Sequence, residues 1–268
     1  MNNRVSIITP SYNSEKYILE TIKSVQKQTY TNWEMIIVDD CSVDNTCSIV
    51  ESISKADSRI NLIRQEKNLG AGLARNRAMS VSKGRFIAYL DSDDIWYPEK
   101  LEKQMQFMVD HGYGFSCSSY EVINDSGKLL HKEIHMLPKV NYIGFLTNNL
   151  LQTVGIMIDT SIVNKDLLIM PDIRRRQDAA TWLQILKANY ICYGFDEILA
   201  QYRRTQNSLS SKKIKAIKGM WYLYRDIEHL PLLFSYYCFI RYVFLAVWKR
   251  VYIRGRKNES AGFNDGLS

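Results

Sequence analysis

The chain has 268 residues, of which 46% are hydrophobic and 24% charged, as is ordinary for a globular protein large enough to bury a substantial core. Its five cysteines are odd in number and never spaced as CxxC, which argues against a disulfide framework or a zinc site and fits a reducing cytosol. The net charge of +7 is uneven: residues 1–200 carry 22 Lys and Arg against 24 Asp and Glu, whereas residues 201–268 carry 13 against 4. The basic character of the C-terminal part indicates an anionic partner there, either a nucleic acid or a membrane.

Strand-like and helix-like segments alternate over the first 112 residues. Runs rich in β-branched and aromatic residues predict strands at 5–9, 33–40, 60–65 and 85–90. Amphipathic periodicity predicts helices at 14–28, from Asp44 onward, at 71–82 and at 98–112. Ser14 and Asp44 are expected to cap the first two helices, while Pro98 and Gly112 mark the beginning and end of the fourth. This order predicts an α/β fold with a Rossmann-like, mostly parallel central sheet and helices on both faces.

Residues 113–170 are less regular. They predict two strands around a turn at Ser126-Gly127, and then a buried strand within 150–163. A further helix is expected within 174–187. We interpret the four histidines as surface or packing residues rather than metal ligands. The N-terminal residues run directly into the first strand, and we expect no secretory signal.

Polar clusters follow three of the predicted strands: "TPSYN" at 9–13, "DDCSVDNT" at 39–46 and "DSDD" at 91–94. The carboxyl ends of parallel strands share one edge of a sheet, where α/β proteins bind ligands. Gathered carboxylates are costly there unless a cation neutralises them, and oxygen ligands select Mg2+ or Mn2+, often shared with phosphate oxygens. For Asp44 or Asp94 alone, a role as helix cap or turn former is the favoured interpretation.

Two segments carry a family resemblance, "VSIITPSYNSEKYILETIKSVQKQTYTNWEMIIVDDCSVDNT" and "NLGAGLARNRAMSVSKGRFIAYLDSDD". They resemble the inverting glycosyltransferases of family 2, which have the GT-A fold. The resemblance covers about residues 3–205 and is most specific over the first 110. It implies a GT-A domain at 1–210, with a nucleotide-sugar-binding half at 1–112 and an acceptor-binding half at 113–210, followed by a basic, aromatic-rich helical tail at 211–268.

The resemblance implies a nucleoside site after the first two strands. Pro10, Tyr12 and Asn13 match the loop that flanks the nucleotide, where the Tyr12 ring is placed to stack on a base. Asp40 matches the carboxylate that accepts the uracil N–H, which favours a UDP-sugar donor.

The resemblance also implies a diphosphate and metal site. Gly70 and Arg75 match the segment that passes the ribose and diphosphate, since glycine permits close approach and arginine suits phosphate. Asp91 and Asp93 form a D-x-D motif, in which Asp91 contacts the ribose and Asp93 binds Mn2+ or Mg2+. The cation stabilises the negative charge that builds on the departing nucleotide. For Arg75, a solvated position on a helix is the alternative.

Asp178 matches the catalytic base of the family, in the first turn of a helix whose dipole favours a carboxylate. The family often has Glu-Asp where this chain has Gln177-Asp178. The basic run at 174–176 faces either an anionic acceptor or solvent. Farther on, residues 201–210 resemble a loop that closes over donor phosphates; Arg203 is a candidate phosphate contact, and Thr205 replaces a common histidine.

The C-terminal segment 230–257 combines six basic residues with many aromatic ones and has no acidic residue. The apolar run of this segment is interrupted too early for a transmembrane helix. A helix that lies in the membrane interface fits better. Its aromatic residues are expected to enter the headgroup boundary: Phe234, Tyr236, Tyr237, Phe239, Tyr242, Phe244 and Trp248. A terminal helix packed on the domain is the alternative, and nucleic-acid binding is disfavoured.

Together these features predict a cytoplasmic enzyme bound peripherally to the inner face of the cell membrane. It is expected to transfer a hexose from a UDP-sugar, with UDP-glucose favoured and UDP-galactose next. Within family 2 the chain most resembles bacterial enzymes that build O-antigen or capsule repeat units on a lipid carrier, which implies an undecaprenyl-diphosphate-linked sugar as the acceptor. In-line attack on an α-linked UDP-hexose would give a β-linkage. The alternatives are a nucleotidyltransferase that makes the sugar nucleotide, and a nucleotide-sugar-binding protein without catalysis.

Overall fold

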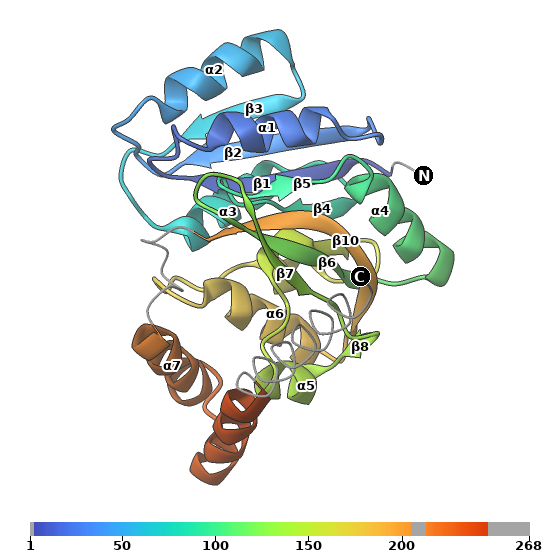
Figure 1. Ribbon diagram of the computed structural model, residues 1–268, viewed down its shortest axis with the longest axis vertical. Helices are drawn as coiled ribbons and strands as arrows, with labels where there is room; N and C mark the ends of the chain where they lie inside the picture. Colours follow the sequence, from blue (N-terminus) through green and yellow to red (C-terminus); the bar gives the residue numbers. More distant parts are fainter. Residues whose placement is uncertain (1–2, 205–212, 246–268) are drawn as a thin grey trace, which may run out of the picture.

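The computed structural model describes residues 3–204 and 213–245. Within them, ten strands form one mixed sheet, whose central order is β3-β2-β1-β4-β9-β6-β10-β5. In Figure 1 the parallel strands β1 to β3 lie in the upper half with α1 and α2, and α5, α6 and α7 lie in the lower half. No helix in the described ranges is both long and apolar enough to span a bilayer.

The first half of the sheet is parallel and follows the predicted alternation. Its strands are β1 (Val5–Ser11), β2 (Trp33–Asp39), β3 (Ile60–Arg64) and β4 (Phe86–Tyr89). They are connected by α1 (Ile18–Gln26), α2 (Thr46–Ala56) and α3 (Ala71–Val81). Every residue of β1 and β2 is buried, as expected for strands covered on both faces. The predicted strands and helices of this half are confirmed.

The second half of the sheet is mixed. Its strands are β5 (Ile95–Trp96), β6 (Phe115–Asn124), β7 (Leu129–Ile134), β8 (Lys139–Val140), β9 (Ile156–Asp159) and β10 (Cys192–Arg204). The helices are α4 (Lys100–His111), α5 (Tyr142–Thr147), α6 (Gln177–Lys187) and α7 (Lys213–Tyr222), with short helical turns at Thr153–Gly155, Lys165–Leu168 and Leu223–Ile227. β9 runs antiparallel between β4 and β6, whereas β10 is parallel to β6. The α/β fold is therefore confirmed, but its parallel character is concentrated in the first half.

Local sequence signals account for some of the helix ends. α4 begins just after Pro98, and Gly112 follows it with φ 66°, in the left-handed region that glycine adopts without strain. Asp44 accepts a hydrogen bond from the Thr46 amide at the start of α2. The prediction that Ser14 caps the next helix by its side chain is wrong, because α1 begins only at Ile18 and has no side-chain cap.

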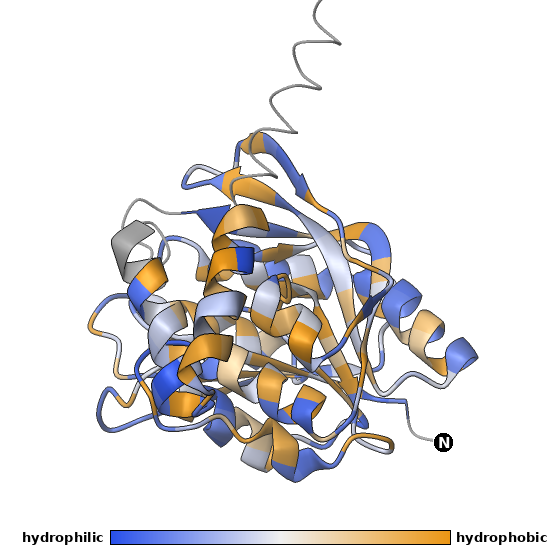
Figure 2. Ribbon diagram, turned by 90° about the horizontal axis from the view of Figure 1, so that it is seen from below, coloured by the Kyte–Doolittle hydropathy of each residue, from blue (hydrophilic) through white to orange (hydrophobic). Residues whose placement is uncertain are grey.

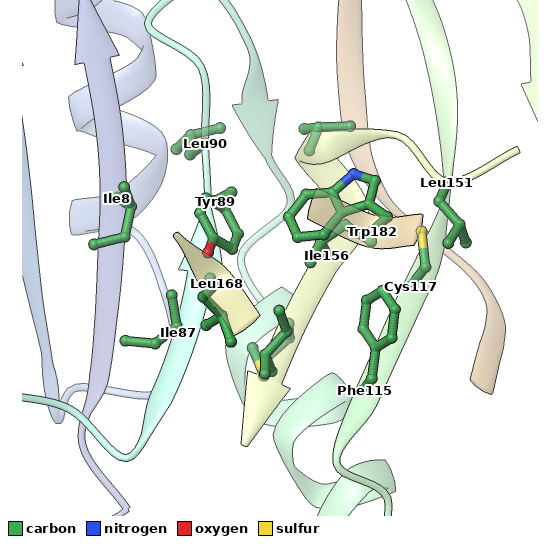
Figure 3. Close-up of a cluster of buried hydrophobic side chains, with 14 of the residues drawn as sticks. Ile8, Ile87, Tyr89, Leu90, Phe115, Cys117, Leu151, Ile156, Leu168 and Trp182 are labelled. Carbon is green, nitrogen blue, oxygen red and sulfur yellow. The ribbon is translucent and has the colours of Figure 1, made fainter. Parts of the chain in front are cut away.

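The core between sheet and helices links the end of β4 to α6. Tyr89 of β4 and Trp182 of α6 are fully buried and meet edge to face, with ring centroids 5.2 Å apart. Figure 3 shows Trp182 among side chains of the central strands, including Phe115 of β6, whose ring centroid lies 6.0 Å away. This packing fixes α6 against the strand that leads into the DSDD segment.

Candidate active site

The carboxyl ends of β1 and β2 are bound together by Asn13. Its backbone N–H donates to the Ser42 hydroxyl at 2.8 Å, and its side-chain oxygen accepts from the Val43 amide at 2.9 Å. Asn13 has φ 49°, a conformation that asparagine tolerates better than most residues. Pro10 is buried within β1, whereas Tyr12 just beyond it is 50% exposed. The Tyr12 ring is therefore accessible at the edge of the sheet where the nucleoside was expected.

Asp40 holds the loop that leads into α3. Its buried carboxylate accepts hydrogen bonds from the Gln65 side chain at 2.6 Å and from the Leu69 and Gly70 amides at 2.7 Å each. A carboxylate has about four lone-pair sites, so about one remains for a further donor. Gly70 adopts φ 93°, and a β-carbon there would lie 3.4 Å from Nη1 of Arg174. The backbone conformation explains the glycine, since the end of the flexible Arg174 side chain could move away from a β-carbon.

Arg75 lies almost fully buried between two carboxylates of the predicted site. It is 4% exposed and forms an ion pair with Asp91. Burial acts to lower the pKa of Arg75, but the negative charges of Asp91 and Asp178 outweigh it and raise that pKa above its ordinary value. Its Nε atom is buried without a hydrogen-bond partner. The structure thus makes Arg75 an electrostatic link between Asp91 and Asp178, and contact with phosphate stays a prediction.

The DSDD segment concentrates negative charge in a poorly solvated place. Burial first, and the neighbouring Asp91 second, raise the pKa of Asp93 to about 6. Asp94 is 1% exposed, and burial also raises its pKa well above the ordinary range. These carboxylates would be stabilised by a bound cation. In the described part of the chain no three His, Cys, Asp or Glu side chains converge on one point, so a cation at Asp93 requires further ligands from phosphate or water.

Arg203, at the end of β10, holds the DSDD segment in place through hydrogen bonds. Its backbone N–H donates to the Asp94 carboxylate at 2.8 Å, and its Nε donates to the Asp93 carbonyl at 2.7 Å. The guanidinium also reaches the carbonyls of residues 124 and 125 and pairs with Glu20 at 2.6 Å. Because Arg203 is 3% exposed and engaged with protein groups, the structure gives it a positioning role that the sequence did not indicate. Its predicted phosphate contact stays a prediction, and Thr205 lies outside the described residues.

Two small hydroxyl residues, whose role here the sequence did not indicate, connect the DSDD segment to the loop after β1 and to α1. The Ser14 and Ser92 hydroxyls are 2.7 Å apart, and the Thr21 hydroxyl donates to the carbonyls of Ser92 and Asp94 at 3.0 and 2.9 Å. Ser14 was predicted to cap the first helix, so the sequence signal pointed to a different role for it. These bonds hold the segment after β4 against the loop and the helix that follow β1.

Asp178 lies in the first turn of α6, close enough to Arg75 for their charges to interact. The Thr153 hydroxyl donates to its carboxylate at 3.4 Å. The preceding Gln177 packs on α3, where a β-carbon on Gly72 would lie 3.1 Å from its Cγ, and its side-chain oxygen is buried without a hydrogen-bond partner. Gly72 therefore allows the two helices to approach, which keeps Asp178 near Arg75.

Comparison with known proteins agrees with this geometry. The chain is 44% identical to "Putative teichuronic acid biosynthesis glycosyltransferase TuaG" of Bacillus subtilis, over 92% of this chain and 97% of that protein. It is 40% identical to "UDP-Glc:alpha-D-GlcNAc-diphosphoundecaprenol beta-1,3-glucosyltransferase WfgD" of Escherichia coli, over 94% and 98%.

Solved structures share the fold. TarS of S. aureus in complex with UDP-GlcNAc superposes with a TM-score of 0.67 at 21% identity, covering 90% of this chain and 71% of that one. The mannosyltransferase PcManGT from Pyrobaculum calidifontis, in complex with GDP-Man and Mn2+, gives 0.69 at 16% identity, covering 100% and 77%. Residues 6–167 match the sequence family described as Glycosyl transferase family 2. The chain therefore belongs to glycosyl transferase family 2, and it is an inverting glycosyltransferase with the GT-A fold.

Proposed function

We propose that the protein transfers glucose from UDP-glucose to a sugar hydroxyl of an undecaprenyl-diphosphate-linked acceptor, in the synthesis of O-antigen or capsule repeat units. The observation that carries the proposal is the Asp91–Arg75–Asp178 arrangement, because it brings a donor-site carboxylate and a candidate base to one place. The substrates are suggested by WfgD and by a second E. coli relative, WfaP, whose name states the same reaction and which is 35% identical over 82% of its length. UDP-galactose is the second candidate donor.

In this proposal the nucleoside lies on the loops after β1 and β2. The exposed Tyr12 ring stacks on uracil, and the one free acceptor position of Asp40 receives the uracil N3–H. Asp91 accepts a ribose hydroxyl with the carboxylate oxygen that Arg75 leaves open. Asn13 and Gly70 shape the loops that approach the nucleotide.

Asp93 is the residue that would hold Mn2+ or Mg2+. Its raised pKa, which is caused first by burial and then by Asp91, reflects a carboxylate that a cation would stabilise. Such a cation, when bound, supplies Lewis-acid stabilisation of the diphosphate leaving group. Arg203 holds the backbone on which Asp93 is carried.

Asp178 acts as the general base in this proposal. Its carboxylate takes the proton from the acceptor hydroxyl as the oxygen attacks the anomeric carbon, and the bond from that carbon to the diphosphate breaks on the opposite side. In-line displacement inverts an α-linked donor to a β-linked product. Membership of a glycosyltransferase family favours this reading over a nucleotidyltransferase or a non-catalytic binding protein.

A transfer assay with a synthetic GlcNAc-diphosphate-lipid acceptor tests the proposal. Parallel reactions contain UDP-glucose, UDP-galactose or UDP-GlcNAc, each with Mn2+, with Mg2+ or with a chelator. We expect product only with UDP-glucose and a divalent cation, and a β-linkage in its NMR spectrum. Transfer that continues undiminished in chelator would contradict the metal assignment, and transfer from another donor alone would contradict the donor assignment.

A further inference from the structure

The described chain ends in a helix over residues 232–245 that is attached to the domain by one side only. Figure 1 shows this helix, coloured red, beside α7 at the lower end of the molecule. Ser235 and Cys238 are fully buried, and Phe239 packs against the core. The Trp221 ring of α7 lies 5.0 Å from the ring of Tyr236 and 5.9 Å from that of Phe239.

This one-sided attachment corrects part of the interpretation of the tail. Phe234, Phe239 and Tyr242 are partly buried and pack against the domain core, so they are less open to a membrane than the sequence suggested. The remaining basic residues of the tail, from Lys249 onward, lie outside the described residues. One side of the helix therefore packs on the domain, and its other side faces outward, where a partner can reach it.

The outward side of the helix is unusually apolar. We define the apolar face as Leu232, Leu233, Tyr236, Tyr237 and Ile240, which are 51, 84, 49, 45 and 64% exposed. Figure 2, which views the molecule from below, shows hydrophobic residues dominating the helix that runs into the grey trace. A helix on the surface of a globular protein ordinarily presents charged and polar residues to water. A contiguous exposed apolar surface of this kind marks a protein or membrane contact.

Charge decides which partner fits. Residues 229–258 contain no Asp or Glu but six Lys and Arg, one of which, Arg241, lies on the helix and donates to the Tyr237 hydroxyl at 3.0 Å. A second copy of this chain would bring the same basic segment against itself. An anionic lipid surface instead offers an apolar interior for the leucine and isoleucine side chains, a headgroup region for the tyrosines, and negative charge for the basic residues.

We propose that the apolar face is a docking surface for the headgroup boundary of an anionic lipid bilayer, a partner whose choice rests on the proposed lipid-linked acceptor. The contact is connected to the site through α7. Trp221 of α7 touches the helix, and a β-carbon on Gly219 of α7 would lie 3.1 Å from Nε of Arg176, two residues before Asp178. The docked face therefore holds the base-bearing end of α6 in a fixed relation to the membrane that carries the acceptor.

Vesicle flotation of the full chain tests the proposal. The test variant carries Leu233→Ser, Tyr237→Ser and Ile240→Ser. The control removes three exposed apolar residues from α3, α4 and β7, by Val81→Ser, Val109→Ser and Leu130→Ser. Vesicles are made of phosphatidylcholine with or without phosphatidylglycerol. We expect the test variant to bind phosphatidylglycerol vesicles at least about tenfold more weakly than wild type, and the control to bind as wild type does.

Three outcomes overturn the proposal. Equal flotation of test variant and wild type shows that the apolar face makes no lipid contact. Equal binding of wild type to vesicles with and without phosphatidylglycerol shows that the partner is not an anionic lipid surface. A wild-type dimer in light scattering that the test variant abolishes, without vesicle binding by either, assigns the face to a second copy. Transfer to a soluble acceptor analogue separates this proposal from the proposed function. The test variant should transfer glucose to the analogue as well as wild type does. If wild type does not use the analogue at all, that result contradicts the proposed function and not the lipid contact.

Discussion

Lys100 should destabilise the protein by an amount that depends on pH. It is the first residue of α4 and is 0% exposed, and its ammonium nitrogen has no hydrogen-bond partner. The nitrogen lies 3.9 Å from the centre of the Trp96 ring, a cation–π contact that replaces only part of the lost hydration. Burial lowers the pKa of Lys100 to about 7. We predict that Lys100→Met stabilises the fold, because methionine fills similar space without a charge.

The size of the change in unfolding free energy follows from the linkage between proton binding and folding. The unfolded chain binds the lysine proton up to pH values near 10.5, whereas the folded chain releases it near 7. Between these values the unfolded state holds more protons, so wild-type stability rises with pH. At pH 6 the lysine costs the folded state at most about 5 kcal/mol, and at pH 9 about 2 kcal/mol. The advantage of Lys100→Met should therefore shrink by about 3 kcal/mol between pH 6 and pH 9.

Urea unfolding of both proteins at pH 6 and pH 9 measures this difference. Lys55→Met is the matched control, since Lys55 is an exposed helical lysine of α2 and its replacement should give no pH-dependent gain. A Lys100→Met advantage that is the same at both pH values would refute the reasoning, because it would show that the side chain does not titrate between the two states.

Three further predictions concern the site. Asp93→Ala should abolish Mn2+-dependent UDP binding; calorimetry that shows unchanged UDP affinity in Mn2+ would exclude Asp93 as the metal ligand. Asp178→Asn keeps the shape of the side chain but cannot accept the hydroxyl proton, so transfer should fall by about 100-fold or more while UDP affinity is retained; near wild-type transfer would place the base elsewhere. Arg203→Met removes the guanidinium that fixes the Asp93 carbonyl, so we expect a lower melting temperature and about tenfold weaker UDP binding in Mn2+. Unchanged affinity in a folded Arg203→Met variant would show that the DSDD segment is held without it.

The parallel half of the fold could be predicted because the sequence signals for its strands and helices are local. Each strand of that half is a short buried run, and each connecting helix shows its own periodicity and end signals, such as Gly112. Once these strands are known to be parallel, their polar carboxyl ends must share an edge. The convergence of residues around Asn13, Asp40 and Asp91 could therefore be expected before any coordinates.

The second half could not be predicted in the same way, because its pairing is not local. β9 inserts between β4 and β6, and the register joins Phe86 to Asp159 across 73 positions of sequence. β5 has only two residues and pairs with β10 about 100 positions later. Lys100 shows the same limit: it occupies a helix start rich in charged residues, and only the tertiary packing around Trp96 makes it buried.

The arginines of the site show why residue type alone does not fix a role. Arg75 and Arg203 were both expected to meet phosphate, since arginine suits phosphate and both lie in motifs near the donor. In the structure each is nearly buried and contacts the protein groups that carry the negative charge: Arg75 pairs with Asp91, and Arg203 holds the backbone of Asp93. A cluster of carboxylates at a sheet edge repels itself before any cation arrives, so it needs fixed positive charges to keep its geometry. The ion pair with Arg75 therefore partly neutralises Asp91, whereas burial and the neighbouring Asp91 keep the pKa of Asp93 raised, in keeping with the metal role proposed for Asp93.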